Sequence, residues 1–204
     1  MLELEKEEIL KKIKEEALEN HVPIVEDEPL KVIETILKLK RPNRILEVGT
    51  AVGYSAINFS KYLCGENSKL KTIELKESMY NKALENITAM GLNDKIEAIN
   101  ADATEYMKNI SDEEQYDVVF IDAAKGQYLV FLEEAIRLTK VGGVIIADNM
   151  LYRGRTLSDY NDHKHRTATN RLREYLVVME EDERLDSTLI KIGDGLAISI
   201  VVKK

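Results

Sequence analysis

The distribution of apolar residues along the chain predicts an alternation of strands and helices. Five short apolar runs are each followed by a longer segment in which apolar residues recur at helical spacing. That alternation is typical of a sheet of parallel strands joined by helices. The five predicted strands are Arg44–Val48, Leu70–Leu75, Ile96–Asn100, Asp117–Asp122 and Gly143–Asp148.

The two ends of the chain complete this pattern. Two amphipathic helices, Glu3–Asn20 and Glu28–Leu39, are predicted before the first strand, and a long helix, Thr167–Glu181, after the fifth. Two β-rich runs, Thr188–Ile192 and Leu196–Val202, then flank a Gly-Asp-Gly turn, which is a strong hairpin signal. We therefore expect an α/β, Rossmann-like fold of the methyltransferase type, with a mostly parallel seven-stranded sheet closed by a C-terminal antiparallel hairpin.

Acidic residues stand at or beside the carboxyl ends of the five predicted parallel strands. Because these strand ends lie on one edge of such a sheet, we expect the five acids to line one crevice. Their mutual repulsion is relieved if the crevice binds hydroxyls and positive charge, as in a ribose, a sulfonium or a divalent cation. The five residues are Glu47, Glu74, Asp102, Asp122 and Asp148.

Length and composition indicate one globular domain. The 204 residues fit a single domain, 1–204, with a helical N-terminal cap over 1–40 and an α/β core over 41–204. The longest apolar stretch falls short of the ~20 residues that a membrane span needs. The first twenty residues form an amphipathic pattern without the apolar core of a secretory signal, so we expect a cytoplasmic protein.

Charge is unevenly distributed along the chain. The formal net charge of −8 argues against a broadly basic nucleic-acid binder. The segment from Leu151 to Arg173 is nevertheless basic, because it contains only two acids, Asp159 and Asp162. It fits either a solvated loop leading into a charged helix or a surface for a polyanion. Its basic residues are Arg153, Arg155, Lys164, Arg166, Arg171 and Arg173.

The segment Leu46–Ser55, LEVGTAVGYS, has the features of a cofactor loop between the first strand and a helix. Its glycines, Gly49 and Gly53, are spaced G-x-x-x-G, whereas a dinucleotide loop has G-x-G-x-x-G. The glycines alone would also fit a tight turn without a ligand. Glu74 can accept both hydroxyls of a ribose, and Asp102 with the backbone of Ala103 can meet an adenine edge. Together these residues favour S-adenosylmethionine.

A metal site is predicted at the ends of the fourth and fifth strands. Asp122, Asp148 and Asn149 offer three oxygen ligands, which suit Mg²⁺ or Mn²⁺ and disfavour zinc. Three protein ligands leave about three octahedral positions, so the site selects a substrate with two adjacent oxygens. The alternative for Asn149 is a turn or helix cap. His163 and His165 are expected to be solvent-facing loop residues, because no further ligand for a second metal lies nearby.

Lys125 is the candidate general base, because it follows Asp122 by three residues, just beyond the fourth strand. A nearby dication disfavours the ammonium form and so favours proton acceptance by this lysine. The alternative is an ordinary surface lysine.

Five motifs of the chain resemble those of the cation-dependent O-methyltransferases related to catechol and caffeoyl-CoA O-methyltransferases. They are LEVGTAVGYSA, TIE at Glu74, ADA, FIDAAKGQY and ADN, and the last two are the most specific. The resemblance spans nearly the whole chain and implies the class I S-adenosylmethionine-dependent fold, a homodimer and Lys125 as a catalytic residue. It also implies cofactor contacts from Val25, which otherwise fits the core, and from Glu47, Gly49, Ser55, Glu74, Asp102, Ala103 and Asp122.

The segments HVPI, AAKGQY, DNMLYRG and IGDGLAIS further resemble bacterial tRNA 5-hydroxyuridine methyltransferases, which form 5-methoxyuridine at the wobble position. The 5-hydroxyl and O4 of that base are adjacent oxygens that can chelate one metal ion. A tRNA anticodon loop is then the expected partner, with phosphates near Arg153, Arg155, Lys164 and Arg166. The alternatives are a small-molecule, catechol-type O-methyltransferase and a cofactor-binding scaffold without catalysis.

Overall fold

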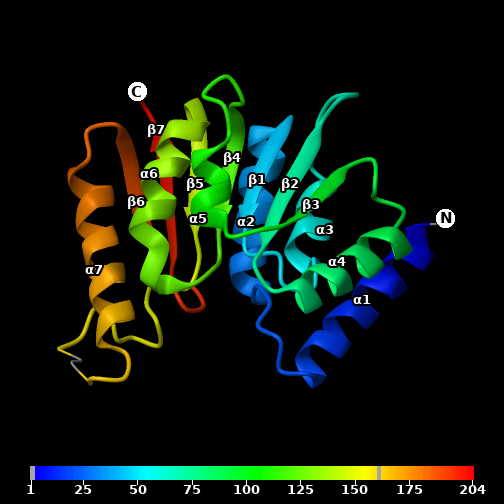
Figure 1. The fold of residues 1–204 in the computed structure, drawn as a ribbon, viewed down its shortest axis with the longest axis horizontal. Coiled ribbons are helices and arrows are strands. Elements are labelled where there is room, and N and C mark those ends of the chain that lie inside the picture. Colours follow the sequence, from blue (N-terminus) through cyan, green and yellow to red (C-terminus); the bar gives the residue numbers. More distant parts are fainter. Residues whose placement is uncertain (1–2, 160–161) are drawn as a thin grey trace. The chain divides into compact units, whose positions relative to one another are not determined.

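The computed structural model describes residues 3–159 and 162–204, which form two compact units. One unit extends to Ala103 and the other begins at Thr104. Helices and strands alternate along both, as the colours of Figure 1 show. The elements of the first unit are α1 (Glu3–Glu19), α2 (Asp27–Lys40), β1 (Arg44–Val48), α3 (Tyr54–Ser60), β2 (Lys69–Glu74), α4 (Glu77–Ala89) and β3 (Ile96–Asn100).

The elements that follow begin at the unit boundary, since helix α5 starts at Ala103. They are α5 (Ala103–Lys108), β4 (Tyr116–Ile121), the short 3₁₀ helix η1 (Lys125–Gln127), α6 (Tyr128–Leu138), β5 (Thr139–Ala147), α7 (Arg166–Glu181), β6 (Leu185–Ile190) and β7 (Leu196–Val201). Among the described residues, no helix combines the length and apolarity that a membrane crossing requires.

The strands of the first unit pair in parallel in the order β3-β2-β1. Their apolar side chains form part of the core, since Ile45, Leu46 and Leu70 are fully buried. The turn into α3 is held by Gly53, whose φ of 82° suits glycine. A Cβ at Gly53 would lie 3.4 Å from the Cβ of Ala83 in α4, so this glycine also permits close packing of the turn.

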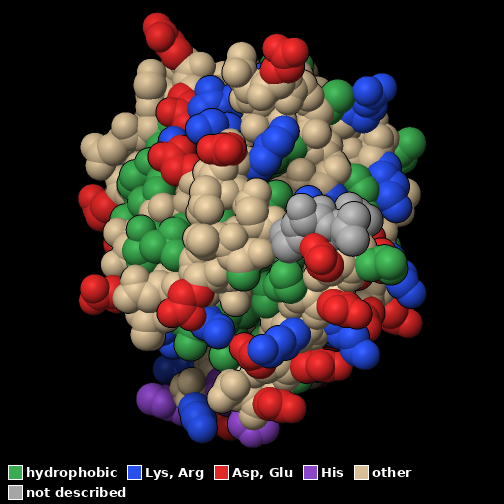
Figure 2. Space-filling model, turned by 90° about the vertical axis from the view of Figure 1, so that its right-hand side faces the viewer, with side chains coloured by type: hydrophobic (Ala, Val, Ile, Leu, Met, Phe, Trp, Pro, Cys, Tyr) green, Lys and Arg blue, Asp and Glu red, His purple; other side chains and the backbone are tan. Residues whose placement is uncertain are grey.

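Ion pairs join the helices of the first unit at its surface. Lys82 of α4 lies 3.2 Å from Glu16 of α1, and Lys14 of α1 pairs with Asp27 of α2. Figure 2 shows acidic and basic side chains next to one another on one face, with apolar side chains between them. Such partly exposed pairs contribute little stability, about 0–1 kcal/mol each.

The strands of the second unit form a mixed sheet in the order β4-β5-β7-β6. Strands β4 and β5 are parallel, whereas β7 pairs antiparallel with both β5 and β6. The predicted C-terminal hairpin is thus present, although β6 spans Leu185–Ile190 and not Thr188–Ile192. Leu189 pairs with Ala197, so the hairpin places the Gly-Asp-Gly tip beyond Ile190 and Leu196.

The predicted start of the fifth strand, at Gly143, was wrong by four residues, because β5 begins at Thr139. A register shift between Tyr116 and Val118 of β4 interrupts the pairing with β5. Gly142, with φ of 78°, lies in the irregular part of β5 and breaks its apolar pattern. A bulge of this kind hides the beginning of a strand from sequence periodicity.

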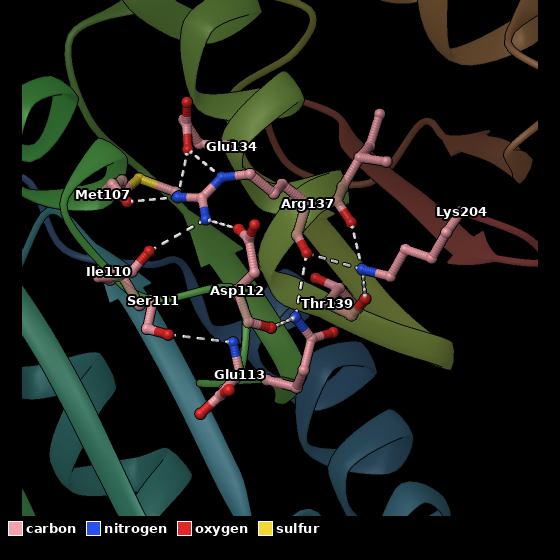
Figure 3. Close-up of polar contacts among 11 residues, drawn as sticks. Met107, Ile110, Ser111, Asp112, Glu113, Glu134, Arg137, Thr139 and Lys204 are labelled. Carbon is pink, nitrogen blue, oxygen red and sulfur yellow. Dashed lines mark hydrogen bonds and ion pairs between the residues drawn. The ribbon is translucent and has the colours of Figure 1, made fainter.

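Arg137 connects the end of α6 to the segment after α5 (Figure 3). Its guanidinium donates to the carbonyl oxygens of Met107, at 2.7 Å, and Ile110, at 3.0 Å, and pairs with Glu134 and Asp112. Nearby, the Lys204 ammonium donates to three carbonyl oxygens at the end of α6 and the start of β5, those of Ile136, Arg137 and Thr139. A helix end leaves such carbonyl oxygens without helical partners, and Lys204 satisfies them.

Candidate active site

The cofactor loop predicted between β1 and α3 is a tight turn tied to β2. Gly49, Ala51 and Gly53 all have positive φ, of 100°, 47° and 82°. The Gly49 N–H donates to the Ile73 carbonyl oxygen at 3.0 Å. The Ala51 N–H donates to Oε2 of Glu74 at 2.8 Å. The loop and the predicted ribose-binding carboxylate are therefore fixed to one another.

Glu74 is the last residue of β2 and is half-buried. Besides the Ala51 N–H, its carboxylate accepts the Lys76 N–H, through Oε1 at 2.9 Å. Each carboxylate oxygen has about two lone-pair directions, so both oxygens can accept a further hydrogen bond. Two backbone donors thus orient a carboxylate that can receive two adjacent hydroxyls.

Glu47 lies inside β1 and is fully buried. Thr72 of β2 donates its hydroxyl proton to Oε2 of Glu47 at 2.6 Å, because a carboxylate only accepts. Thr50 lies 2.6 Å from the same Thr72 oxygen and must therefore donate to it. The chain from Thr50 through Thr72 to Glu47 fixes the carboxylate at the base of the cofactor loop.

The other predicted cofactor residues of the first unit lie at the expected ends of elements. Ser55 is in the first turn of α3, Asp102 lies two residues after β3, and Ala103 is the first residue of α5; all three are half-buried. Val25, between α1 and α2, is only 4% exposed and lies in the core. Its contact with a cofactor stays a prediction.

In the second unit the structure brings the three predicted metal ligands together. Asp122 follows β4, and Asp148 and Asn149 follow β5. The Asn149 side-chain amide donates to Oδ1 of Asp122 at 3.1 Å, and the Asn149 N–H donates to Oδ1 of Asp148 at 2.6 Å. Asn149 has φ of 61°, a left-handed conformation that Asn tolerates better than most residues.

Burial raises the pKa of the Asp122 carboxyl, and Lys125 and the Asn149 amide oppose that rise. A buried carboxylate of this kind is stabilised by a neighbouring cation. Within residues 3–159 and 162–204, no three His, Cys, Asp or Glu side chains are arranged to hold a metal ion. That finding does not test the predicted set, because its third ligand is an asparagine, and the set stays a prediction.

Tyr128, which the sequence analysis did not single out, connects the predicted base to the predicted ligands. Its hydroxyl donates to the Asp148 carbonyl oxygen at 2.9 Å, and its ring packs edge-on against Tyr175. The Lys125 ammonium lies 5.7 Å from the centre of the Tyr128 ring and 6.0 Å from that of Tyr152. A buried tyrosine three residues after Lys125, in the quoted FIDAAKGQY motif, was the available signal.

The segment after the ligands is anchored to the tip of the β6–β7 hairpin. The Met150 N–H donates to the Gly195 carbonyl oxygen at 2.9 Å, and the Leu151 N–H donates to the Asp194 carbonyl oxygen at 2.7 Å. The Asp194 carboxylate accepts the Arg153 N–H. The IGDG segment therefore shapes the loop beside the predicted metal ligands, a role that the sequence did not disclose.

The basic residues of this region divide into two groups. Arg153, Lys164 and Arg166 are exposed, and the Arg155 guanidinium lies 4.9 Å from the centre of the Tyr152 ring. Arg171 is exposed too but pairs with Glu174, and the half-buried Arg173 donates to main-chain carbonyl oxygens. The second group is thus engaged within the protein.

His163 is exposed as expected, but the same expectation was wrong for His165. His165 is half-buried, and its Nδ1 lies 2.9 Å from the Tyr152 hydroxyl. The two rings meet edge to face at 5.7 Å. The sequence could not show this, because the partners are 13 residues apart across an irregular loop.

The chain matches the O-methyltransferase family model over residues 2–203. Among curated proteins, it is 30% identical to the tapetum-specific methyltransferase 1 of Arabidopsis thaliana, covering 94% of this chain and 85% of that protein. It is 28% identical to a catechol O-methyltransferase of Niastella koreensis, covering 84% of this chain and 79% of that protein.

Solved structures agree with this assignment. A putative caffeoyl-CoA O-methyltransferase from Staphylococcus aureus superposes with a TM-score of 0.86 at 31% identity, covering 94% of this chain and 91% of that one. The O-methyltransferase from Bacillus cereus in complex with SAH gives a TM-score of 0.83 at 25% identity, covering 95% and 90%.

The chain belongs to the O-methyltransferase family, and its class is that of the S-adenosylmethionine-dependent O-methyltransferases. The fold predicted from the sequence is confirmed as the Rossmann-like methyltransferase fold. It has a mostly parallel seven-stranded sheet, antiparallel C-terminal strands and N-terminal helices. The resemblance to catechol and caffeoyl-CoA O-methyltransferases is confirmed as well.

Proposed function

We propose that this O-methyltransferase uses S-adenosylmethionine and a divalent cation, Mg²⁺ or Mn²⁺, to methylate the 5-hydroxyl of 5-hydroxyuridine at the wobble position of tRNA. The observation that carries the proposal is the cluster of Asp122, Asp148 and Asn149 beside Lys125. A basic loop, which is the part of the basic segment from Leu151 up to α7, follows this cluster directly in the sequence.

The first unit fits S-adenosylmethionine. The glycine turn at Gly49 and Gly53 keeps side chains off the backbone, and Glu74 presents an oriented carboxylate for the ribose hydroxyls. The buried Glu47 and the half-buried Ser55 lie at the two ends of the turn, where the methionine part would bind. The SAH complex of the Bacillus cereus relative supports this cofactor.

The second unit fits a divalent cation. Two carboxylates and one amide make a hard oxygen set, and turning the Asn149 amide about its last torsion would present its oxygen in place of its nitrogen. When bound, the cation acidifies an acceptor hydroxyl and S-adenosylmethionine supplies an electrophilic methyl group. Asp148 is buried, so the surrounding protein restricts the movement of its carboxylate.

Lys125 is the proposed proton acceptor. It opens η1, and the rings of Tyr128 and Tyr152 flank its ammonium group. In its neutral amine form, Nζ would accept the proton of the acceptor hydroxyl as the hydroxyl oxygen bonds to the methyl carbon. The carbon–sulfur bond of S-adenosylmethionine would break at the same time, and S-adenosylhomocysteine would leave as the neutral thioether. Tyr128 holds both Lys125 and the backbone of Asp148, so the base and one ligand share a support.

The exposed basic side chains support a polyanionic acceptor. Arg153, Lys164 and Arg166 are open to solvent, and Arg153 follows Asn149 by four residues. A single-stranded anticodon loop offers phosphates for such residues and a splayed base for the metal. The 5-hydroxyl and O4 of 5-hydroxyuridine match the two adjacent oxygens that the ligand set selects. We expect the enzyme to act as a cytoplasmic homodimer.

A catechol-type small molecule is the second candidate acceptor, which the relative named a catechol O-methyltransferase favours. The same ligands and Lys125 would serve it, because a catechol also offers two adjacent oxygens. It would not need the basic loop.

The test compares methyl transfer to tRNA containing 5-hydroxyuridine and to catechol, for the wild-type protein and for charge reversals at Arg153 and Arg166. The reversals should lower labelling of tRNA severalfold and leave catechol labelling unchanged. Lys108→Glu, an exposed lysine on α5, is the matched control. Unchanged tRNA methylation in both reversals would show that the basic loop does not bind the acceptor. Labelling of catechol alone would show that the acceptor is a small molecule and not tRNA.

A further inference from the structure

We propose that Arg173 is a positioning residue for the acceptor, which acts by holding the backbone of residues 155–158 and not by binding phosphate. The inference rests on the proposed function, since it takes this loop as the acceptor side of the site. It assigns a role to an arginine whose sequence position alone suggested a phosphate contact.

One guanidinium binds three carbonyl oxygens of the loop. The Arg173 Nε donates to Thr156 at 3.1 Å, and Nη2 donates to Arg155 at 3.2 Å and to Ser158 at 2.5 Å. Its Nη1 donates to the Asn170 side chain at 3.3 Å. Arg173 is half-buried on α7, and Thr156 is only 4% exposed. Three of these four hydrogen bonds are thus made to the protein's own backbone.

The opposite end of the same loop is held by the hairpin tip. Asp194 binds the N–H groups of Leu151 and Arg153, through its carbonyl oxygen and its carboxylate respectively. Between these two anchors, Tyr152 and Arg153 have positive φ, of 47° and 57°. Such backbone persists only where surrounding contacts over-determine it, and Asp194 and Arg173 supply those contacts.

The held backbone sets side chains that reach the predicted base. Arg155, whose carbonyl oxygen Arg173 holds, places its guanidinium 4.9 Å from the centre of the Tyr152 ring. The Tyr152 hydroxyl meets Nδ1 of His165, and its ring lies 6.0 Å from the Lys125 ammonium. If the hydrogen bonds from Arg173 to the loop were lost, the side chains of Arg155 and Tyr152 would therefore move.

The first experiment separates positioning from phosphate binding through salt dependence. Arg173→Lys keeps the charge but cannot span three carbonyl oxygens. We expect it to raise KM for 5-hydroxyuridine tRNA about tenfold with little change in kcat, as for the loss of charge-assisted hydrogen bonds. Two variants that each remove one charge are then compared by the slope of log KM against the logarithm of the salt concentration. Arg173→Gln should keep the wild-type slope, and Arg153→Gln should reduce it by about one phosphate contact.

Arg171→Lys is the matched control, because Arg171 lies on the same helix, is exposed and pairs with Glu174. It should leave KM and the salt slope unchanged. A reduced slope in Arg173→Gln would identify a direct phosphate contact and overturn the proposal. An unchanged KM in Arg173→Lys would overturn it too.

The second experiment needs no acceptor and keeps its meaning if tRNA is not the substrate. Trypsin should cleave folded Arg173→Lys after Arg153 or Arg155 several times faster than the wild-type protein, because the released loop opens more often. The exchange of arginine for lysine keeps the number of trypsin sites constant, and Arg171→Lys should cleave as the wild type does. Equal cleavage rates for Arg173→Lys and wild type, at equal Tm, would contradict the tether. If the wild-type protein does not methylate tRNA but Arg173→Lys is cleaved faster than the wild type, the proposed function is rejected and the role of Arg173 in holding the loop is kept.

Discussion

At the scale of single residues, side chains of the candidate site are fixed by hydrogen bonds within the protein. Glu74 is oriented by two backbone N–H groups, and Glu47 by a chain of two threonines. Tyr128 fixes the backbone of Asp148 from the buried side. Preorganised groups of this kind bind without the cost of being ordered at that moment.

Replacement of Glu74 by Gln should weaken cofactor binding. The amide keeps the shape but loses the charge and part of the acceptor capacity for ribose hydroxyls, so we expect Kd for S-adenosylmethionine to rise about tenfold or more. Titration calorimetry measures it, with Glu77→Gln in the exposed first turn of α4 as the control. Equal affinity of Glu74→Gln and wild type would remove Glu74 from the cofactor site.

Replacement of Tyr128 by Phe should loosen the metal ligands. The variant loses one buried hydrogen bond to the Asp148 carbonyl oxygen, which costs about 1 kcal/mol of stability. We expect the Mg²⁺ concentration for half-maximal activity to rise severalfold, while the Kd of S-adenosylmethionine is unchanged. Tyr80→Phe on α4 is the control. A loss of stability without any change in the Mg²⁺ titration would make Tyr128 purely structural.

At the scale of elements, the β6–β7 hairpin does more than end the sheet. Its tip binds the backbone of Met150, Leu151 and Arg153, directly after the predicted ligand Asn149. The tip approaches so closely that a Cβ at Gly195 would lie 2.4 Å from Cγ of Leu151 and 2.9 Å from its backbone nitrogen. The hairpin tip and residues 150–153 therefore form one packed structure.

Replacement of Gly195 by Ala separates this close approach from backbone strain. Gly195 has φ of 89°, and Gly91 has φ of 66° with no atom within 4 Å of its would-be Cβ. Gly91→Ala therefore measures the strain alone, about 1 kcal/mol. We expect Gly195→Ala to lower the free energy of unfolding by about 1–3 kcal/mol more, through overpacking, and to lower activity. Equal losses in urea unfolding of both variants would show that the tip has room.

At the scale of the whole molecule, part of the fold and of the candidate site is predictable from the sequence and part is not. The boundaries of β1 and β3 were predicted to the residue, because a short apolar run with polar or glycine neighbours is a local signal. The grouping of Asp122, Asp148 and Asn149 was predicted from strand ends alone and is present. That all five strand-end acids line one crevice stays a prediction.

Contacts between residues that are far apart in the chain could not be predicted from the sequence. Arg153 and Asp194 are 41 residues apart, and Tyr128 and Asp148 are 20 apart. Side-chain direction in irregular loops has no period, so neither these contacts nor the carbonyl contacts of Arg173 could be read from the pattern. The basic segment was recognised as a stretch of charge, but its division into exposed and engaged arginines required the structure.

Acid stability depends on a surface cluster that joins α6 to the start of β6. The Arg184 guanidinium hydrogen-bonds to Asp182 and Glu133, and these bonds hold the pKa of both carboxyls below their usual range. Because the folded pKa values are the lower ones, the stabilisation is complete above the unfolded values, near pH 4 (about 3.9 and 4.3), and is lost as pH falls through the folded values.

Arg184→Met should therefore lower the urea midpoint of unfolding at pH 7. The difference in midpoint between the variant and the wild type should become smaller at more acid pH. The partly exposed carboxyls limit the effect to a small change. Arg171→Met, whose ion pair with Glu174 is half exposed, is the control. A gap that stays constant from pH 7 to acid pH would show that the contribution of Arg184 is packing and not charge.

The most direct test of the central claim is to identify the methylated nucleoside. Purified protein is incubated with labelled S-adenosylmethionine and tRNA carrying 5-hydroxyuridine, with Mg²⁺ or with a chelator, and the digested tRNA is analysed by mass spectrometry. We expect labelled 5-methoxyuridine with Mg²⁺, and none with chelator or in Asp148→Ala. Labelled 5-methoxyuridine in the chelator would contradict the metal mechanism, and no labelled nucleoside at all would contradict the acceptor.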